Sequence, residues 1–238
     1  MGVAGLGLGS FEIVDEIGST SEALKERAAA GGGEAALMAR RQVAGRGRLG
    51  RVWATVEGNL HLSVLVRPGG RIRPGHWSLL AAVALADAVL PWVVRGGVPG
   101  GLRLKWPNDL LLDGGKLAGI LLEAGEDAGP WLVIGFGVNL AGAPQGLGRA
   151  VASLDGAVGA EAFAVTLLAA LAGWRRRYAA EGYGPIREAW LGLGPALGSA
   201  VTAGSVRGGF AGLDEDGALV LRTGMGMGRA VITSGEVS

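Results

Sequence analysis

Three arginines alternate with glycines in residues 45–53 (GRGRLGRVW): Arg46, Arg48 and Arg51. Guanidinium groups provide planar donors for carboxylates and phosphates, and glycines let backbone amides approach an anion closely. The stretch is therefore a candidate loop for an anionic ligand. The alternative is a solvated surface hairpin whose arginines only aid solubility, and the loop by itself leaves both open.

The first six residues of this stretch also satisfy the G-x-G-x-x-G pattern of a dinucleotide-binding loop. That pattern is meaningful only between a strand and a helix, with an acidic residue about 20 positions further on. Here the residues that follow (RVWATVEGNLHLSVLV) are typical of a strand, and no acid lies at the required place. We therefore reject a dinucleotide-binding fold.

Further polar residues capable of chemistry lie downstream, around two turns. In KWPNDLLL, residues 105–112, Asn108 could bind a ligand and Asp109 could hold a metal or orient a cation, although proline, asparagine and aspartate are also ordinary turn residues. In DGGKLAGILLE, Lys116 follows a flexible turn at the start of an apolar strand. Gly119 within that strand marks either a close backbone approach to a ligand or only the glycine-rich composition.

Asn139 ends a long apolar segment, GFGVN, and is exposed to whatever lies beyond that strand. The two histidines, His61 and His76, each lack a second candidate ligand, so we interpret both as structural. A metal site built on histidine is not expected.

The elements that must position these residues follow from periodicity and turn signals. Ser19 and Glu22 form a capping-box signature for a first helix, and Pro91 is expected to end the second helix. Predicted strands occupy residues 11–17, 35–43, 59–68, 102–106, 110–112, 116–124 and 131–140. Predicted helices occupy residues 19–30, 76–90, 160–178 and a short segment near 185–191. The last 40 residues alternate short strands with turns, so we divide the chain into a main domain, 1–194, and a small all-β domain, 195–238.

Composition narrows the class of protein. The 238 residues carry a net charge of +1, are 49% hydrophobic and contain no cysteine. Disulfides, thiolate metal sites and a cysteine nucleophile are thereby excluded, and bulk charge does not favour nucleic acid. The N-terminus lacks the pattern of a signal peptide, and the apolar residues 79–94 are shorter than a membrane span of about 20 residues. We expect a soluble, cytoplasmic protein.

Taken in order, the motifs GSTSEALK, RQVAGRGRLGRVW, GNLHLSV, KWPNDLLL, GKLAGILLE and IGFGVNL resemble those of the biotin protein ligases. The resemblance covers most of the chain, and the combination is far more specific than any single motif. It implies an α+β fold like that of the class II aminoacyl-tRNA synthetases, with a mixed sheet and helices on one side. It also implies a small C-terminal SH3-like β-barrel.

The resemblance further implies an ATP-dependent ligase. Such an enzyme converts biotin to biotinyl-5′-AMP and transfers biotin to a lysine of a biotin carboxyl carrier domain. ATP and biotin are then substrates, Mg²⁺ is the activating ion, and no tightly bound cofactor is expected. The carrier domain is the expected partner, with no role for DNA or a membrane, and a homodimer is left open.

Residue roles carry over by position. Lys116 and Arg48 are expected to be catalytic, and Asp109 is the candidate metal ligand. The biotin set is Ser19, Thr20, Ser21, Gln42, Arg46, Gly47, Arg48, Lys116 and Gly119. The nucleotide set is Arg48, Arg51, Trp53, Asn108, Lys116 and Asn139.

Two departures from the family pattern matter. Ser21 stands where the family commonly has asparagine, which weakens an expected contact with the biotin head group. Only about 18 residues precede Ser19, so the DNA-binding domain of some relatives is not expected. Two alternatives stay open: a lipoate or octanoate ligase or transferase of the same superfamily, and, more distantly, a nucleic-acid-binding module built on the Arg/Gly loop.

Overall fold

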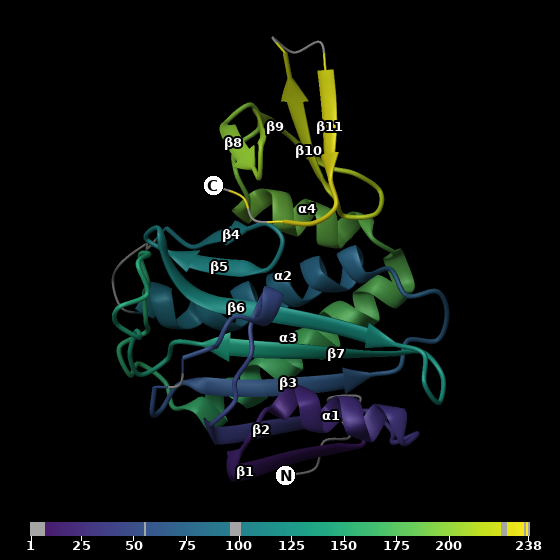
Figure 1. Ribbon diagram of the computed structural model, residues 1–238, viewed down its shortest axis with the longest axis vertical. Coiled ribbons are helices and arrows are strands. Elements are labelled where there is room, and N and C mark those ends of the chain that lie inside the picture. Colours follow the sequence, from purple (N-terminus) through teal and green to yellow (C-terminus); the bar gives the residue numbers. More distant parts are fainter. Residues whose placement is uncertain (1–7, 55, 96–100, 225–227, 236, 238) are drawn as a thin grey trace.

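A seven-stranded mixed sheet forms the centre of the larger part of the molecule (Figure 1). The computed structural model describes residues 8–54, 56–95, 101–224, 228–235 and 237. The strands lie in the order β1 (Ser10–Ile17), β2 (Ala35–Gln42), β3 (Leu60–Val66), β7 (Trp131–Val138), β6 (Gly115–Gly125), β5 (Asp109–Leu112) and β4 (Arg103–Lys105). Only β1 and β2 pair in parallel, and every other neighbouring pair is antiparallel. The predicted strands are thus confirmed as one sheet.

Three helices cover one face of this sheet: α2 (Pro74–Arg95), α3 (Ala160–Glu181) and α4 (Gly184–Leu193). Leu60, Leu62 and Val64 of β3 pack in their core. The fourth helix, α1 (Thr20–Ala29), lies on the opposite face, where its Leu24 packs with Leu65 of β3. The expectation of helices on one side therefore holds for α2, α3 and α4, while α1 covers part of the other face and leaves the rest for the Arg/Gly loop.

The start of α1 follows the predicted capping box. The Ser19 side chain accepts a hydrogen bond from the Glu22 backbone N–H at 3.4 Å, which satisfies one of the free donors at the helix N-terminus. This cap fixes where the chain turns from β1 into the helix. Thr20 and Ser21 are consequently buried at the first turn, directly over the sheet.

The expected helix end at Pro91 is wrong, because α2 continues to Arg95. A proline within a helix removes one hydrogen bond, here to the carbonyl of Asp87. Asp87 and Pro91 are both on the exposed side, where water can satisfy that carbonyl. Val89 and Val93 stay buried against the core and hold the helix across the proline.

Helix α2 extends beyond the predicted residues 76–90 and is strongly apolar. Residues Pro74–Val93 have the length and mean hydropathy, 1.4, of a membrane-crossing segment, but 72% of that apolar window is buried inside the molecule. Its apolar surface packs on the sheet and on α3. The high hydropathy of α2 is therefore explained by its position in the core.

A second, four-stranded antiparallel sheet follows α4 and stands at the top of Figure 1. It contains β8 (Ala200–Ala203), β9 (Val206–Leu213), β10 (Leu219–Thr223) and β11 (Gly228–Ile232), in the order β11-β10-β9-β8. Val237 then pairs with Ala203 of β8, so the chain returns from one edge of the sheet to the other. This curling fits the expected small barrel, and the domain division at residue 194 stays a prediction.

The turn between β9 and β10, residues 214–218, docks on the larger part of the molecule. His76 Nε2 lies 2.7 Å from the Glu215 carbonyl oxygen, and the Trp106 indole donates to the Gly217 carbonyl at 3.1 Å. Trp106 precedes the turn that carries Asn108. The C-terminal sheet is therefore fixed directly beside one of the predicted site motifs.

Candidate functional site

One cavity of about 300 Å³ opens between the start of α1, the Arg/Gly loop and strands β5, β6 and β7. It is lined by every predicted site residue except Asn139. These are Ser19, Thr20, Ser21, Gln42, Arg46, Gly47, Arg48, Arg51, Trp53, Asn108, Asp109, Lys116 and Gly119. Residues separated by about 100 positions in the sequence thus share one wall.

Uncharged polar groups form one end of the cavity. The Thr20 backbone N–H and hydroxyl lie 2.7 Å and 3.0 Å from Gln42 Oε1. Ser63 Oγ lies 2.7 Å from the Thr20 hydroxyl and 2.9 Å from that of Ser21. A β-carbon at Gly135 would lie 2.7 Å from Ser21 Oγ, so only glycine admits this arrangement. Ser63 was not among the predicted site residues, although a polar residue that alternates with leucines in the strand NLHLS was the available signal.

The Arg/Gly loop, residues 45–53, folds back on itself rather than opening a helix. The Gly47 N–H donates to the Arg51 carbonyl at 2.7 Å, and the Trp53 N–H donates to the Gly45 carbonyl at 3.0 Å. Its tip is a short 3-10 turn, Arg48–Gly50, with Leu49 at φ 57°. The structure thus confirms that the loop joins two strands and is not a dinucleotide-binding turn.

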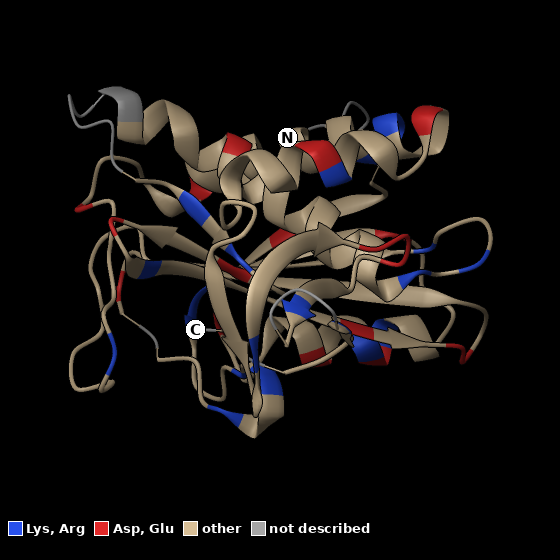
Figure 2. Ribbon diagram, turned by 90° about the horizontal axis from the view of Figure 1, so that it is seen from above, with Lys and Arg blue, Asp and Glu red and all other residues tan. Residues whose placement is uncertain are grey.

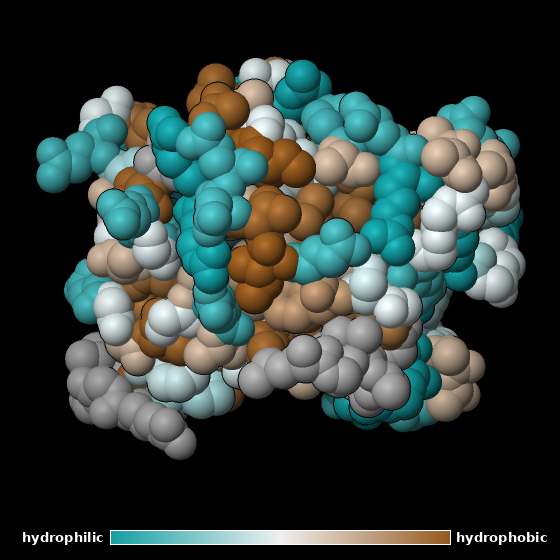
Figure 3. Space-filling view, turned by 90° about the horizontal axis from the view of Figure 1, so that it is seen from below, coloured by the Kyte–Doolittle hydropathy of each residue, from teal (hydrophilic) through white to brown (hydrophobic). Residues whose placement is uncertain are grey.

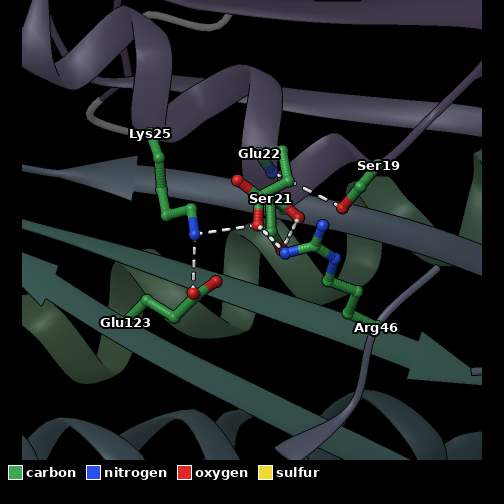
Figure 4. Close-up of polar contacts among 7 residues, drawn as sticks. Ser19, Ser21, Glu22, Lys25, Arg46 and Glu123 are labelled. Atoms are coloured by element: carbon green, nitrogen blue, oxygen red, sulfur yellow. Dashed lines mark hydrogen bonds and ion pairs between the residues drawn. The ribbon is translucent and has the colours of Figure 1, made fainter. Parts of the chain in front are cut away.

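Two of its arginines tie the loop to the rest of the molecule. Arg46 pairs with Glu22 of α1 at 3.0 Å, next to a Lys25 ion pair with both Glu22 and Glu123 (Figure 4). Arg48 donates to Asn108 Oδ1 and to the Gly235 carbonyl, each at 3.1 Å. Arg48 therefore joins the loop, the turn before β5 and the C-terminal segment at one point.

The Trp53 indole lies across β6 and β7, where two glycines face each other. Gly119 and Gly137 are paired in register. A β-carbon on Gly119 would lie 3.0 Å from Trp53 Cζ3, and one on Gly137 only 2.3 Å from Trp53 Cε2. The neighbours of Gly119 in this structure are the Trp53 ring and the Lys116 side chain, whose Nζ would also lie 3.0 Å from a β-carbon there, and the close approach of a ligand to Gly119 stays a prediction.

The Lys116 side chain lies beside this ring, next to Gly119. Its Nζ is 2.5 Å from Asp109 Oδ1 and 5.6 Å from the centre of a Trp53 ring. The turn at residues 113–115 joins β5 to β6 and brings the two side chains together although they are seven residues apart. Asp109 thus orients a cation, one of the two roles expected for it.

Asn139 is the exception among the predicted residues. Its side chain is buried, donates to the Lys116 and Ala152 carbonyls at 3.3 Å and 3.0 Å, and accepts from Asn59 at 3.3 Å. The structure therefore places Asn139 behind the cavity wall, where it supports the backbone of Lys116. Its expected contact with a nucleotide stays a prediction.

The cavity is strongly cationic although the chain is nearly neutral. Acidic and basic residues are interspersed over the molecule in Figure 2. The described residues that line the cavity nevertheless include six cations and a single carboxylate, that of Asp109. The cations are Arg46, Arg48, Arg51, Lys105, Lys116 and Arg149. Of these, Lys105 and Arg149 were not among the predicted site residues, and Arg149 has no motif around it that could have identified it.

Neither histidine is part of a metal cluster. Among the described residues, no group of three or more His, Asp or Glu side chains could hold a metal ion. Burial lowers the pKa of His61 to about 4. His76 contacts the Tyr178 hydroxyl at 2.9 Å and stacks on Tyr183, with ring centres 3.9 Å apart. The structural interpretation of His76 thus agrees with its contacts.

Two family models and several known proteins match this chain. A family model for the biotin/lipoate A/B protein ligase family matches residues 17–139, and a model for the biotin protein ligase C terminal domain matches residues 197–238. A biotin--[acetyl-CoA-carboxylase] ligase of Paracoccus denitrificans is 41% identical over 223 residues, 86% of this chain and 90% of that protein. The chain belongs to the biotin protein ligases. As a member of this ligase family, it is an enzyme.

Other members of the biotin protein ligases support the same assignment. A bifunctional ligase/repressor of Bacillus subtilis is 32% identical over 230 residues, which cover 90% of this chain and 69% of that protein. The structure of the biotin protein ligase from Aquifex aeolicus in complex with biotin and ATP is similar with a TM-score of 0.79. It is 26% identical, and the match covers 97% of this chain and 98% of that one. The expected fold is confirmed over nearly the whole chain.

Proposed function

We propose that this chain is an ATP-dependent ligase that activates biotin as biotinyl-5′-AMP and transfers biotin to a lysine of a biotin carboxyl carrier domain. The observation that carries the proposal is the division of one cavity into an uncharged hydroxyl end and a cationic end. A ligand with a neutral polar head and a carboxylate, placed against a polyphosphate, matches both ends.

In the first step, a biotin carboxylate oxygen attacks the α-phosphorus of ATP. A new P–O bond forms as the bond to the oxygen bridging to the β-phosphorus breaks, and pyrophosphate leaves. The carboxylate and the triphosphate repel each other, so fixed cations at the meeting point lower the barrier. Lys116 and Arg48 line the cavity where these groups would meet, and each is already held in place by a hydrogen-bond partner. We assign them the catalytic roles.

In the second step, the carrier lysine amine attacks the acyl carbon of the mixed anhydride. A C–N bond forms, the C–O bond to AMP breaks, and the amine nitrogen loses a proton. No enzyme nucleophile takes part, so the absence of cysteine is compatible with the reaction. The Arg/Gly loop would act as a lid that keeps water from the anhydride before this step.

The biotin head group is assigned to the hydroxyl end. Thr20, Ser21 and Gln42 already share hydrogen bonds with one another or with Ser63, so their donors and acceptors are oriented before a ligand binds. Ser19, Arg46, Gly47 and Gly119 complete this set. Because Ser21 is shorter than asparagine and bonded to Ser63, its share of head-group recognition is expected to be small. The nucleotide is assigned to the side of Arg48, Arg51, Trp53, Asn108 and Lys116.

Mg²⁺ is expected to bind together with ATP. Mg²⁺ usually keeps several waters and binds one or two carboxylates together with substrate phosphates. Asp109 is the single carboxylate among the described residues of the cavity wall, so it fits at most as one ligand. Because Asp109 is paired with Lys116, its geometry favours the orienting role.

The exposed edge of the main sheet is a candidate surface for pairing with a second copy of the chain. The strand β1 is an edge of the main sheet, and Figure 3 shows a band of apolar side chains at this end of the molecule, flanked by hydrophilic ones. Ile13 of β1 is 37% exposed. Such edges can pair with a second copy, and we propose a homodimer through β1. Light scattering on a size-exclusion column would show a dimer that Ile13→Lys disrupts, whereas a monomeric wild-type chain would refute the homodimer.

We place the reaction in the cytoplasm and assign it no DNA or membrane partner.

The closest alternative is a lipoate or octanoate ligase or transferase, because one family model covers both groups of proteins. The match of residues 197–238 to the biotin-specific C-terminal model favours biotin. Mass spectrometry of a carrier domain incubated with the chain and ATP tests the choice. We expect the mass of one biotinyl group with biotin and no change with lipoate. Modification with lipoate alone would contradict the proposal.

A further inference from the structure

The carboxylate of Glu22 has partners other than those its place in the helix predicts. In a capping box, the glutamate side chain accepts a hydrogen bond from the backbone N–H of the capping residue, here Ser19. Among the described residues, Glu22 Oε1 instead lies 3.0 Å from Arg46 Nη1 of the Arg/Gly loop and 2.8 Å from Lys25 Nζ. The Glu22 backbone N–H still donates to Ser19 Oγ. Helix capping therefore accounts for the backbone of Glu22 and leaves its side chain for another role.

Lys25 holds the Glu22 carboxylate in place from within the fold. Its Nζ lies between Glu22, one turn earlier in α1, and Glu123 of β6, at 2.8 Å from each (Figure 4). These three side chains are only 24–33% exposed, whereas the Arg46 side chain is 60% exposed. Glu22 is thus a fixed anchor on the helix and the sheet, and Arg46 is the exposed partner that it holds.

Arg46 carries the Arg/Gly loop with it. Its backbone forms an antiparallel bridge with Val52, so the two ends of residues 45–53 are joined as one unit. On the side of β5, Arg48 already ties this unit to Asn108. The contact with Glu22 adds a second attachment, on the side of α1. Together the two attachments hold the loop across the cavity.

The guanidinium group of Arg46 can serve Glu22 and a ligand together. Arg46 lines the cavity, whereas Glu22 is not among the residues of the cavity wall. A guanidinium has N–H donors on all three of its nitrogens, and the printed contact uses Nη1. The other N–H groups are left for an anion in the cavity. Glu22 therefore acts on a ligand only through Arg46.

We infer that Glu22 is a positioning residue for the Arg/Gly loop: its carboxylate, held by Lys25, fixes Arg46 at the rim of the cavity before a ligand binds. The effect on catalysis rests on the proposed function, in which Arg46 belongs to the biotin set. Ordering a binding loop in advance reduces the entropy lost on binding. The charge of Glu22 should therefore lower the KM for biotin and leave the rate at saturating biotin unchanged.

Hydrogen–deuterium exchange measured by mass spectrometry tests the contact without any substrate. Glu22→Gln keeps the size of the side chain and the backbone cap but removes the charge, so exchange in residues 45–53 should become faster. Added NaCl should speed this exchange in the wild-type chain and have little effect in Glu22→Gln, because salt screens exposed ion pairs. Glu26→Gln is the matched control, since Glu26 is an exposed carboxylate of the same helix. Equal exchange in the wild-type chain and Glu22→Gln would overturn the inference.

Steady-state kinetics test the consequence for biotin. Exposed ion pairs are individually weak, so Glu22→Gln should raise the KM for biotin about three- to fivefold, with kcat and the KM for ATP unchanged. Glu22→Asp keeps the charge and should recover part of the loss, and Glu26→Gln should match the wild-type chain. A lower KM for biotin in Glu22→Gln would overturn the inference, because it would show that Glu22 competes with the ligand for Arg46.

A double-mutant cycle shows whether Glu22 acts through Arg46. In an Arg46→Gln background, Glu22→Gln should cause no further rise in the KM for biotin, because the contact is already lost. The same rise with and without Arg46 would assign Glu22 a different role and contradict the inference. If the wild-type chain makes no biotinyl-5′-AMP, the proposed function fails, while the exchange experiment still decides whether Glu22 holds the loop.

Discussion

The ammonium group of Lys116 lies 2.5 Å from the carboxylate of Asp109, with only 14% and 19% of the two side chains exposed. The pair closes the β5–β6 hairpin on the cavity side and holds the cation above the Trp53 ring. A shielded carboxylate in this position keeps a flexible lysine at one point. Lys116 is therefore oriented before any anionic substrate arrives.

Removing the charge of Asp109 tests this orienting role. A hydrogen bond to a charged group contributes about 1.5–3 kcal/mol, so Asp109→Asn should lower kcat about 10- to 100-fold. The Mg²⁺ concentration that gives half-maximal activity should stay the same. Asp127→Asn removes the same charge from an exposed loop and should leave activity unchanged. A large rise in the Mg²⁺ requirement of Asp109→Asn would instead assign Asp109 as a metal ligand.

Filling the space over the paired Gly119 and Gly137 should displace the Trp53 ring. In Gly137→Ala the new methyl group would lie 2.3 Å from Trp53 Cε2, whereas in Gly142→Ala it would meet only a Val56 methyl at an ordinary 3.7 Å. Overpacking of this kind costs about 1–3 kcal/mol. We expect the KM for ATP of Gly137→Ala to rise about tenfold in enzyme assays, with Gly142→Ala unchanged. Equal kinetics in both variants would show that the missing side chain at Gly137 does not set the position of the ring.

Closure of the Arg/Gly loop can be followed by limited trypsin digestion. Arg46 and Arg51 lie in the loop, and the neighbouring Leu49 and Val52 are 78% and 83% exposed, so the open loop should be cut readily. Biotin and ATP together should slow cleavage at these arginines, because the anionic ligands engage their side chains. Lipoate with ATP is the control and should give no protection. Unchanged cleavage with biotin and ATP would contradict the proposed lid.

Burial of His61 makes stability depend on pH. Its pKa in the folded chain is about 4, below the ordinary 6.5, so the unfolded chain binds this proton more tightly. The contribution of this pKa difference to the free energy of unfolding is fully present above about pH 6.5. As the pH falls toward 4, about 3 kcal/mol of that free energy is lost. The pKa of His76 is also lowered by burial, which acts in the same direction.

Urea unfolding between pH 7 and pH 4 separates the two histidines. The free energy of unfolding of His61→Gln should fall less steeply than that of the wild-type chain, whereas His76→Gln should keep most of the slope. Parallel curves for wild type and His61→Gln would mean that His61 does not titrate as its burial requires.

Much of the fold could be predicted because local signals agreed with it. Alternating apolar residues marked the strands, and Ser19 with Glu22 marked the start of α1. Pro91 was misjudged because a proline breaks a helix only when tertiary packing does not hold it, and the burial of Val89 and Val93 is not visible in the sequence. The placement of α1 opposite the other helices likewise depends on long-range packing.

The cavity-lining residues that belong to a recognisable motif were predicted, and those that reach the cavity only through the fold were missed. Residues from the Arg/Gly loop and the two turns near Asp109 and Lys116 do meet in one cavity. Arg149 reaches that cavity only because residues 150–152 pair with the backbone of Lys116, a contact between distant segments. Asn139 ends the right strand, but the register turns its side chain behind the wall.

The most direct test of the central claim is biotin-dependent exchange of labelled pyrophosphate into ATP. The wild-type chain should catalyse exchange with biotin and not with lipoate. Lys116→Ala should lose at least about 100-fold, since one such donor contributes about 3 kcal/mol to the transition state. Lys25→Ala, which removes a lysine outside the cavity wall, should retain exchange. A folded wild-type chain that exchanges pyrophosphate with lipoate but not with biotin would contradict the account.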